Sequence, residues 1–189
     1  GLFRAEDTNP EWKSVLPISD VTAISFSENS TQDSRAWLGT SSGEVFVSED
    51  RGNTWQQAAP APTRKSIVSI GVFHDNLESE LLITITFDPR TQTLSLWRRS
   101  GEKWQLWLES PSAVPTAQII ERDQHSGEII VSLGIRCWQW VSGLWHAVLK
   151  TDKPILRLSQ HPAGGIIALT AGSILFSQDI LNWTTMYHS

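Results

Sequence analysis

Paired carboxylates are the residues of this sequence with the most obvious chemistry. Asp88 and Asp152 fall on predicted loops that share one face of the molecule. Two carboxylates about 5–10 Å apart can cleave a glycosidic bond, one as the acid and the other as the base or nucleophile. Acids at loop positions are far more often solvated turn residues. We therefore expect no catalysis from this pair.

The other nucleophilic and metal-ligating side chains show no working arrangement. The five histidines are His74, His125, His146, His161 and His188. None of them has H-x-H or H-E-x-x-H spacing. Cys137 lies in an apolar run beside Trp138, which indicates a buried structural thiol, and a single cysteine excludes a disulfide framework. The sequence predicts no catalytic residue, no metal site and no cofactor.

One eight-residue motif stands out between two apolar runs. Residues 48–55 read S-x-D-x-G-x-T-W, with Ser48, Asp50, Gly52, Thr54 and Trp55 at the defined positions. In a hairpin turn the Asp50 carboxylate can accept backbone N–H groups, and Gly52 can adopt a positive φ. Trp55 can fold back over the turn as an apolar plug. These roles are structural, so the motif predicts a hairpin turn that is held together by its own side chains.

Two partial copies of the motif occur near the ends of the chain. Residues 5–12 keep Asp7 and Trp12, and residues 177–183 keep Ser177, Asp179 and Trp183 but are one residue shorter. The segments that end at Trp104 and Trp145 keep only a glycine and the tryptophan.

The motif and its copies resemble the Asp-box, or BNR repeat, of sialidase-like β-propellers. The resemblance implies a propeller fold and places the boxes away from any catalytic centre. Sialidases bind their substrate with three arginines and use a Tyr–Glu pair, whereas the only tyrosine here is Tyr187, near the C-terminus. The chain is nearest in kind to non-catalytic photosystem II assembly-factor-like propellers, and we expect no sialidase or other glycosidase activity.

Evenly spaced tryptophans indicate the repeats that must carry the motif. Trp12, Trp55, Trp104, Trp145 and Trp183 are 43, 49, 41 and 38 residues apart, the period of a propeller blade. Four short apolar runs precede or contain each later tryptophan, which predicts an all-β chain of about four and a half four-stranded blades. Within one domain, 1–189, we expect a half blade at 1–16 and blades at 17–60, 61–110, 111–150 and 151–189.

Composition limits the class of partner. The 189 residues include 15 Lys+Arg and 20 Asp+Glu, for a net charge of −5, which argues against nucleic acid. No apolar run is long enough to span a membrane.

The predicted strand order sorts the loops onto two faces. The motif's face takes most of the acids, among them Asp7, Glu28, Asp33, Asp75, Glu78 and Asp123. The opposite face is roughly neutral and carries a candidate interaction surface of six bases: Arg64, Lys65, Arg90, Arg136, Lys150 and Lys153. Five further tryptophans, Trp37, Trp97, Trp107, Trp138 and Trp140, either pack between blades or form an aromatic binding surface.

These observations predict a non-catalytic protein-interaction or assembly module. The alternative is a carbohydrate-binding or glycoside hydrolase-related propeller, which spare tryptophans would serve. The half blade at residues 1–16 lacks its two inner strands, and its apolar residues need cover. We expect a protein partner or additional chain to complete the propeller, in preference to a homo-oligomer or a self-closed monomer.

Overall fold

The computed structural model describes residues 1–6, 9–27, 35–58, 62–74, 80–121 and 128–188, and every regular element in these ranges is a β-strand. The prediction of an all-β chain is confirmed. Within the described ranges, no helix has the length and apolarity that crossing a membrane requires.

A two-stranded hairpin begins the chain, and four four-stranded antiparallel sheets follow it. The hairpin pairs β1 (Leu2–Glu6) with β2 (Asn9–Leu16). Blade 1 consists of β3 (Val21–Phe26), β4 (Ala36–Thr40), β5 (Val45–Ser48) and β6 (Gln56–Gln57). Blade 2 consists of β7 (Ser66–His74), β8 (Glu80–Asp88), β9 (Thr93–Ser100) and β10 (Lys103–Pro111). Blade 3 consists of β11 (Ala117–Glu121), β12 (Ile129–Leu133), β13 (Arg136–Val141) and β14 (Leu144–Lys150). Blade 4 consists of β15 (Ile155–Gln160), β16 (Ile166–Thr170), β17 (Ser173–Ser177) and β18 (Thr184–His188).

The strands of each blade lie in chain order, so each pairs with the next through a turn. The second strands of blades 1 and 3, β4 and β12, are buried along their whole length. Their continuous apolar runs are typical of strands with two covered faces.

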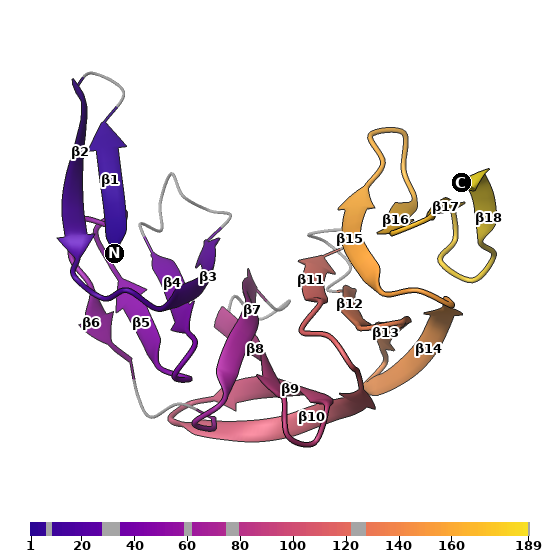
Figure 1. The fold of residues 1–189 in the computed structure, drawn as a ribbon, viewed down its shortest axis with the longest axis horizontal. Coiled ribbons are helices and arrows are strands. Elements are labelled where there is room, and N and C mark those ends of the chain that lie inside the picture. Colours follow the sequence, from indigo (N-terminus) through magenta and orange to yellow (C-terminus); the bar gives the residue numbers. More distant parts are fainter. Residues whose placement is uncertain (7–8, 28–34, 59–61, 75–79, 122–127, 189) are drawn as a thin grey trace.

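The sheets follow one another round an open arc, with the first strand of each blade on the inner side and the fourth on the outer side (Figure 1). Contacts between blades run mainly through the first strands: β7 packs against β3 and β4, β11 against β7, and β15 against β11 and β12.

The buried core is divided into three clusters, one at each junction between consecutive blades. The cluster between blades 1 and 2 contains Trp37, Val45, Ile67, Ile70, Val72 and Leu82. The cluster between blades 2 and 3 contains Phe73, Ile83, Ile85, Leu94, Leu96, Ile129, Val131 and Leu133. The cluster between blades 3 and 4 contains Ile130, Cys137, Ile155, Leu158, Ile166, Ala168 and Ile180. Each sheet thus buries its apolar side chains against the next sheet.

Gly39 permits the closest approach between blades 1 and 2. A Cβ atom added to it would lie 2.5 Å from Cγ2 and 2.9 Å from Cβ of Ile67, a fully buried residue at the start of blade 2. Close-packed interiors have little free volume to absorb such an overlap. The glycine therefore sets the distance between the two sheets.

We predict that Gly39→Ala lowers the free energy of unfolding by about 1–3 kcal/mol, the usual cost of overpacking. Ile67→Ala alone leaves a cavity, which costs about 2–5 kcal/mol. Because the second change makes room for the first, the double variant should lose clearly less than the sum of the two. Urea titration of the four proteins measures this, and strictly additive losses would contradict the proposed contact.

Candidate functional site

The segment Ser48–Trp55, called the first motif turn below, closes on itself through the Asp50 carboxylate. Oδ1 of Asp50 accepts the backbone N–H of Thr54 (2.8 Å) and the Ser48 hydroxyl (2.8 Å), and Oδ2 accepts the Thr54 hydroxyl (2.7 Å). The Gly52 N–H donates to Ser48 Oγ at 2.8 Å. The half-buried Trp55 donates its indole N–H to the Gly52 carbonyl at 3.2 Å, so its ring folds back over the turn.

These bonds determine the acidity of Asp50. Above all the Thr54 backbone N–H, and then the Thr54 and Ser48 hydroxyls, stabilise the charged form and lower the pKa of Asp50 to about 2. A carboxylate with so low a pKa is a poor general base, and its oxygens are already occupied by its own turn.

The segment Ser177–Trp183, the second motif turn, reaches the same result with one residue fewer. Asp179 accepts the backbone N–H and the side-chain amide of Asn182, at 2.8 and 2.7 Å, and its pKa is also lowered to about 2, mainly by Asn182. Trp183 donates to the carbonyl of Ile180 at 2.7 Å, as Trp55 does to Gly52. Ile180 therefore occupies the Gly52 position, with φ of 72° against 83°, and its side chain is fully buried.

In the copy at residues 5–12, the residues that the structure describes are paired as strands. Asp7 lies outside the described residues, but Trp12 lies within β2, where its side chain is 71% exposed. The reason is the register of the hairpin: Glu6 pairs directly with Asn9, so strand pairing continues where a motif turn would need several unpaired residues. The expected position of Trp12 at the end of a folded-back turn was wrong.

The two acids of the predicted catalytic pair have different surroundings. Asp88 ends β8, where Lys65 Nζ lies 2.9 Å from Oδ2 and the Arg90 N–H donates to Oδ1 at 2.9 Å. These contacts, with Lys65 first, lower the pKa of Asp88 to about 2. Asp152 is exposed in the link between β14 and β15. The described contacts of Asp88 include no group of Asp152, so the pair forms no shared site.

The histidines and the cysteine are scattered. His125 lies outside the described residues, and His161 accepts the Ala163 N–H in its own turn. Among the residues that the structure describes, no three His, Cys, Asp or Glu side chains gather as metal ligands. Cys137 is fully buried, as the sequence predicted, and burial raises the pKa of its thiol to about 12.

The additional tryptophans fill the junctions between blades. Trp107 of blade 2 stacks on Trp140 of blade 3 with ring centroids 4.5 Å apart, and Trp145 lies 5.6 Å and 5.1 Å from them. Trp138 packs against the same cluster, and Trp37 is buried between blades 1 and 2. Trp107, Trp138 and Trp140 thus pack at the junction between blades 2 and 3, and Trp37 packs between blades 1 and 2, where it also lines a pocket. Trp97 donates to the Thr86 hydroxyl within blade 2 (3.0 Å).

The ends of the strands opposite the motif turns form the face that we call the linker face, because the links between blades lie there. It contains a groove of about 420 Å³ between the end of blade 2 and the start of blade 3. Pro111, Ala113, Val114, Ile135 and Pro154 supply most of its lining, and Thr91, Gln92 and Ser112 complete it. The groove offers a largely apolar surface.

Basic residues of the candidate interaction surface follow or precede the groove's lining directly in the chain. Arg90 precedes Thr91, Arg136 follows Ile135, and Lys153 precedes Pro154. Arg136 and Lys150 are directly opposite each other on β13 and β14, and no described contact pairs either with an acid. Arg64 is exposed in the link before β7. Lys65 differs from the other five, since Asp88 holds its ammonium group.

Acids of the linker face are engaged within the protein. The Ser42 hydroxyl donates to Asp20 (2.9 Å), that of Ser95 to Glu109 (2.9 Å), and the Gln57 amide to Glu44 (3.2 Å). Asp152 has no such partner among the described residues. The expected acidic character of the opposite face stays a prediction, because Glu28, Asp33, Asp75, Glu78 and Asp123 lie outside the described ranges.

Sequence reasoning missed both the groove and a second pocket between blades 1 and 2. The groove combines four segments that are far apart in the chain, two turns within blades and two links between blades, and no spacing signal connects them. In the second pocket Arg35 and Trp37 are two residues apart, a signal for one face of a strand, but Arg99 comes from another blade. Only the packing of the blades brings these residues together.

No known protein family and no curated protein matches the sequence. Solved structures do match the fold. The extracellular domain of a putative hybrid two-component system from B. thetaiotaomicron has a TM-score of 0.70 at 13% identity, over 95% of this chain and 24% of that chain. YCF48 bound to a D1 peptide has a TM-score of 0.60 at 20% identity, over 94% and 56%. The GH74 xyloglucanase from Xanthomonas campestris has a TM-score of 0.69 at 13% identity, over 97% and 34%.

At these identities the likeness concerns the fold alone. The chain spans about a quarter to somewhat over half of the length of these structures. Together with the four blades of the open arc, the matches confirm the predicted fold class, a β-propeller segment.

The motif turns predict a loss of stability in acid. Because the folded pKa of Asp50 and Asp179 lies below the usual 3.8, their contribution is complete above about pH 4 and is lost as the pH falls towards 2. Asp50→Asn/Asp179→Asn should flatten the fall in unfolding free energy over this range, as measured by urea titration. Asp152→Asn, at an exposed residue without a described hydrogen bond, is the control and should leave the profile as it is.

Gly52 and Ile180 share a left-handed backbone conformation, which predicts an unusual order of stability among variants at these positions. Gly52→Ala should cost about 1 kcal/mol, because a Cβ atom there has room but the φ is unfavourable. At Ile180 both small residues lose buried packing, but glycine also relieves the backbone. Ile180→Gly should therefore be more stable than Ile180→Ala by about 1 kcal/mol, the reverse of the ordinary order. Thermal unfolding of the three variants measures this, and a less stable glycine variant would contradict it.

Proposed function

We propose that this chain is a non-catalytic protein-interaction or assembly module of the Asp-box propeller kind. Its binding site is the linker-face groove, and its partner is an acidic, partly apolar segment of another protein. The observation that carries the proposal is the pair Arg136 and Lys150 beside an apolar groove.

Arg136 and Lys150 carry like charges at directly opposite positions of neighbouring strands. Such pairs are destabilising, because the two side chains lie on the same side of the sheet. A bound carboxylate between them would remove the repulsion and could accept a bidentate bond from the guanidinium. The repulsion is therefore a feature that binding of an acidic segment would relieve.

The groove supports a protein partner rather than an isolated anion. Apolar residues of an extended segment can contact Val114 and Ile135 while acidic residues reach Arg136, Lys150 or Lys153. Apolar anchors with a charged rim are common in protein interfaces. The D1 peptide in the YCF48 structure gives one case of peptide binding by a protein of this fold.

The low-identity match to a xyloglucanase concerns the fold only, so it does not carry the carbohydrate alternative. A sugar site would also need aromatic faces open to a pyranose ring. Here the ring centroids of Trp107, Trp140 and Trp145 lie 4.5–5.6 Å apart in stacked, edge-on and tilted contacts, which leaves no space between them for a sugar ring. This packing supports the interaction module.

The test uses a fluorescent ten-residue peptide of alternating glutamate and leucine, and a matched peptide with glutamine in place of glutamate. We predict that the acidic peptide binds, that the glutamine peptide binds more weakly, and that Arg136→Gln/Lys150→Gln weakens the acidic peptide about tenfold or more. The same double variant should keep or slightly raise the melting temperature, because it removes a repulsion. Fluorescence anisotropy and thermal unfolding give the two readouts.

Lys13→Gln/Lys103→Gln is the matched control, since it removes two exposed bases outside the linker face. It should leave the affinity nearly unchanged. Equal binding of both peptides, or an equal loss in the control variant, would show that the linker face is not the site.

A further inference from the structure

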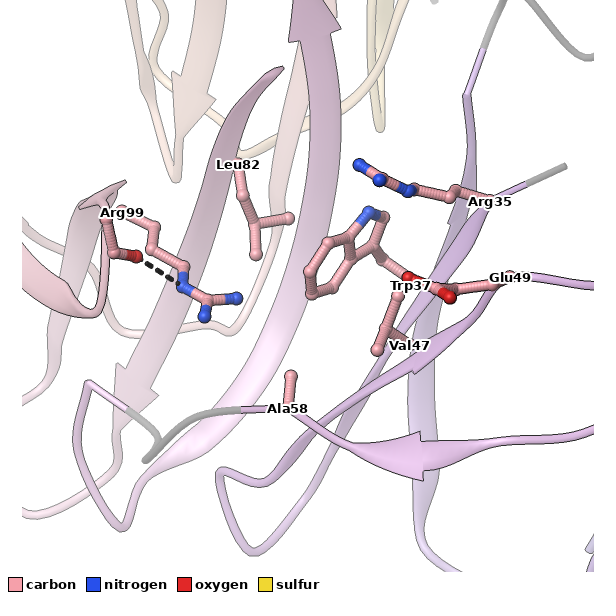
Figure 2. A pocket seen from close by; sticks show the side chains of 8 residues that line it. Arg35, Trp37, Val47, Glu49, Ala58, Leu82 and Arg99 are labelled. Carbon is pink, nitrogen blue, oxygen red and sulfur yellow. Dashed lines mark hydrogen bonds between the residues drawn. The ribbon is translucent and has the colours of Figure 1, made fainter. Parts of the chain in front are cut away.

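A second pocket of about 370 Å³ opens between blades 1 and 2, at the ends of the strands opposite the linker face. Trp37, Val47 and Leu82 line it together with Arg35, Glu49 and Arg99, and Figure 2 shows the indole ring between the two arginines. Its volume lies at the lower end of the range of about 300–1,000 Å³ for small-ligand sites. The pocket therefore suits one small group rather than a long segment.

Arg99 is held in place before any ligand arrives. Its Nε donates to the Gly101 carbonyl at 3.0 Å, and its guanidinium carbon lies 5.7 Å from the centre of the Trp37 ring. Its two terminal nitrogens have no hydrogen-bond acceptor among the described residues. A guanidinium that is fixed through Nε presents its remaining N–H groups in the planar arrangement that matches a carboxylate.

The pocket holds hydrogen-bond donors that have no acceptor among the described residues. Besides the terminal nitrogens of Arg99, the buried indole N–H of Trp37 has no hydrogen-bond partner there, as is also the case for the indole N–H groups of Trp138 and Trp145 elsewhere in the chain. The lining thus favours a ligand with hydrogen-bond acceptors, and Val47 and Ala58 offer half-buried apolar contact.

We propose that this pocket binds a carboxylate carried on an apolar group, either a free organic acid or the C-terminal residue of a peptide. The terminal nitrogens of Arg99 bind the carboxylate, and the apolar group contacts Val47 and Ala58. The carboxylate of Glu49, exposed in the same lining, carries the same charge as the ligand and opposes its binding. The site is independent of the linker-face groove.

The test follows the indole N–H signal of Trp37 by two-dimensional NMR, with the signal assigned by Trp37→Phe. Phenylacetate and the peptide acetyl-Ala-Ala-Phe with a free C-terminus are titrated, each against its amide. We expect the Trp37 signal to shift with the acids and to stay in place with the amides. A response to phenylacetate alone identifies a free-acid site, and a response to both acids identifies one that also takes a peptide C-terminus.

Two substitutions in the pocket should change the affinity for phenylacetate in opposite directions. Arg99→Gln should weaken phenylacetate binding about tenfold or more, since it removes a charge-assisted bond. Glu49→Gln should strengthen it several-fold by removing the like charge. Because Glu49 is an exposed turn residue, that variant tests the site even where Arg99→Gln unfolds.

Arg98→Gln is the matched control. Arg98 is the neighbour of Arg99 in β9, but its guanidinium lies over Trp107 at 5.0 Å, at the junction between blades 2 and 3. It should leave the affinity unchanged. Equal shifts with acids and amides, equal losses in the Arg98 and Arg99 variants, or no gain in Glu49→Gln would each overturn the proposal. None of these results bears on peptide binding at the linker face, which is measured separately.

Discussion

The packing of each blade against the next is the interaction on which the rest of this structure depends. A four-stranded sheet has two faces and cannot cover either of them alone. Here the first strands β7, β11 and β15 pack against the preceding blade, and the buried residues divide into one cluster at each junction. The distance between sheets is set by residues such as Gly39 and Ile67. Any site that combines residues of two blades inherits its geometry from these junctions.

The carboxylates of the motif turns accept their hydrogen bonds within the turns themselves. Asp50 and Asp179 accept hydrogen bonds from their own turns, and the low pKa that results keeps both carboxyls charged over most of the pH range. A carboxylate whose oxygens already accept hydrogen bonds from its own turn has little capacity left to accept one from a substrate. The capacity to bind something else lies where donors or apolar surface are left over, at the linker-face groove and at Arg99.

Strand positions followed from the sequence because each depends on a local pattern. The apolar runs Ile129–Leu133 and Ile155–Gln160, for example, are bounded by turn residues and form strands. The position of Trp12 was predicted wrongly, because similarity to the motif does not reveal the register of the hairpin. Glu6 pairs with Asn9, so the strands continue to where the motif turn was expected. Ile180 was not foreseen at a glycine position, since a β-branched residue rarely adopts a positive φ and only its burial among blade 3 and 4 residues accounts for it. Both proposed binding sites were missed for a common reason: their residues meet only after the blades have packed.

The net charge of −5 limits how either site can attract an acidic ligand. At physiological ionic strength, charges are screened beyond about 8 Å. Over longer distances, the acids of the chain therefore do not repel an acidic ligand, and its bases do not attract one. Recognition must then rest on contacts within that range. Arg99 satisfies this condition because Gly101 and Trp37 hold its guanidinium in place, which reduces the ordering cost of binding. Arg136 and Lys150 satisfy it differently: their mutual repulsion is already present in the free protein, and its relief contributes to binding only when a carboxylate comes into direct contact.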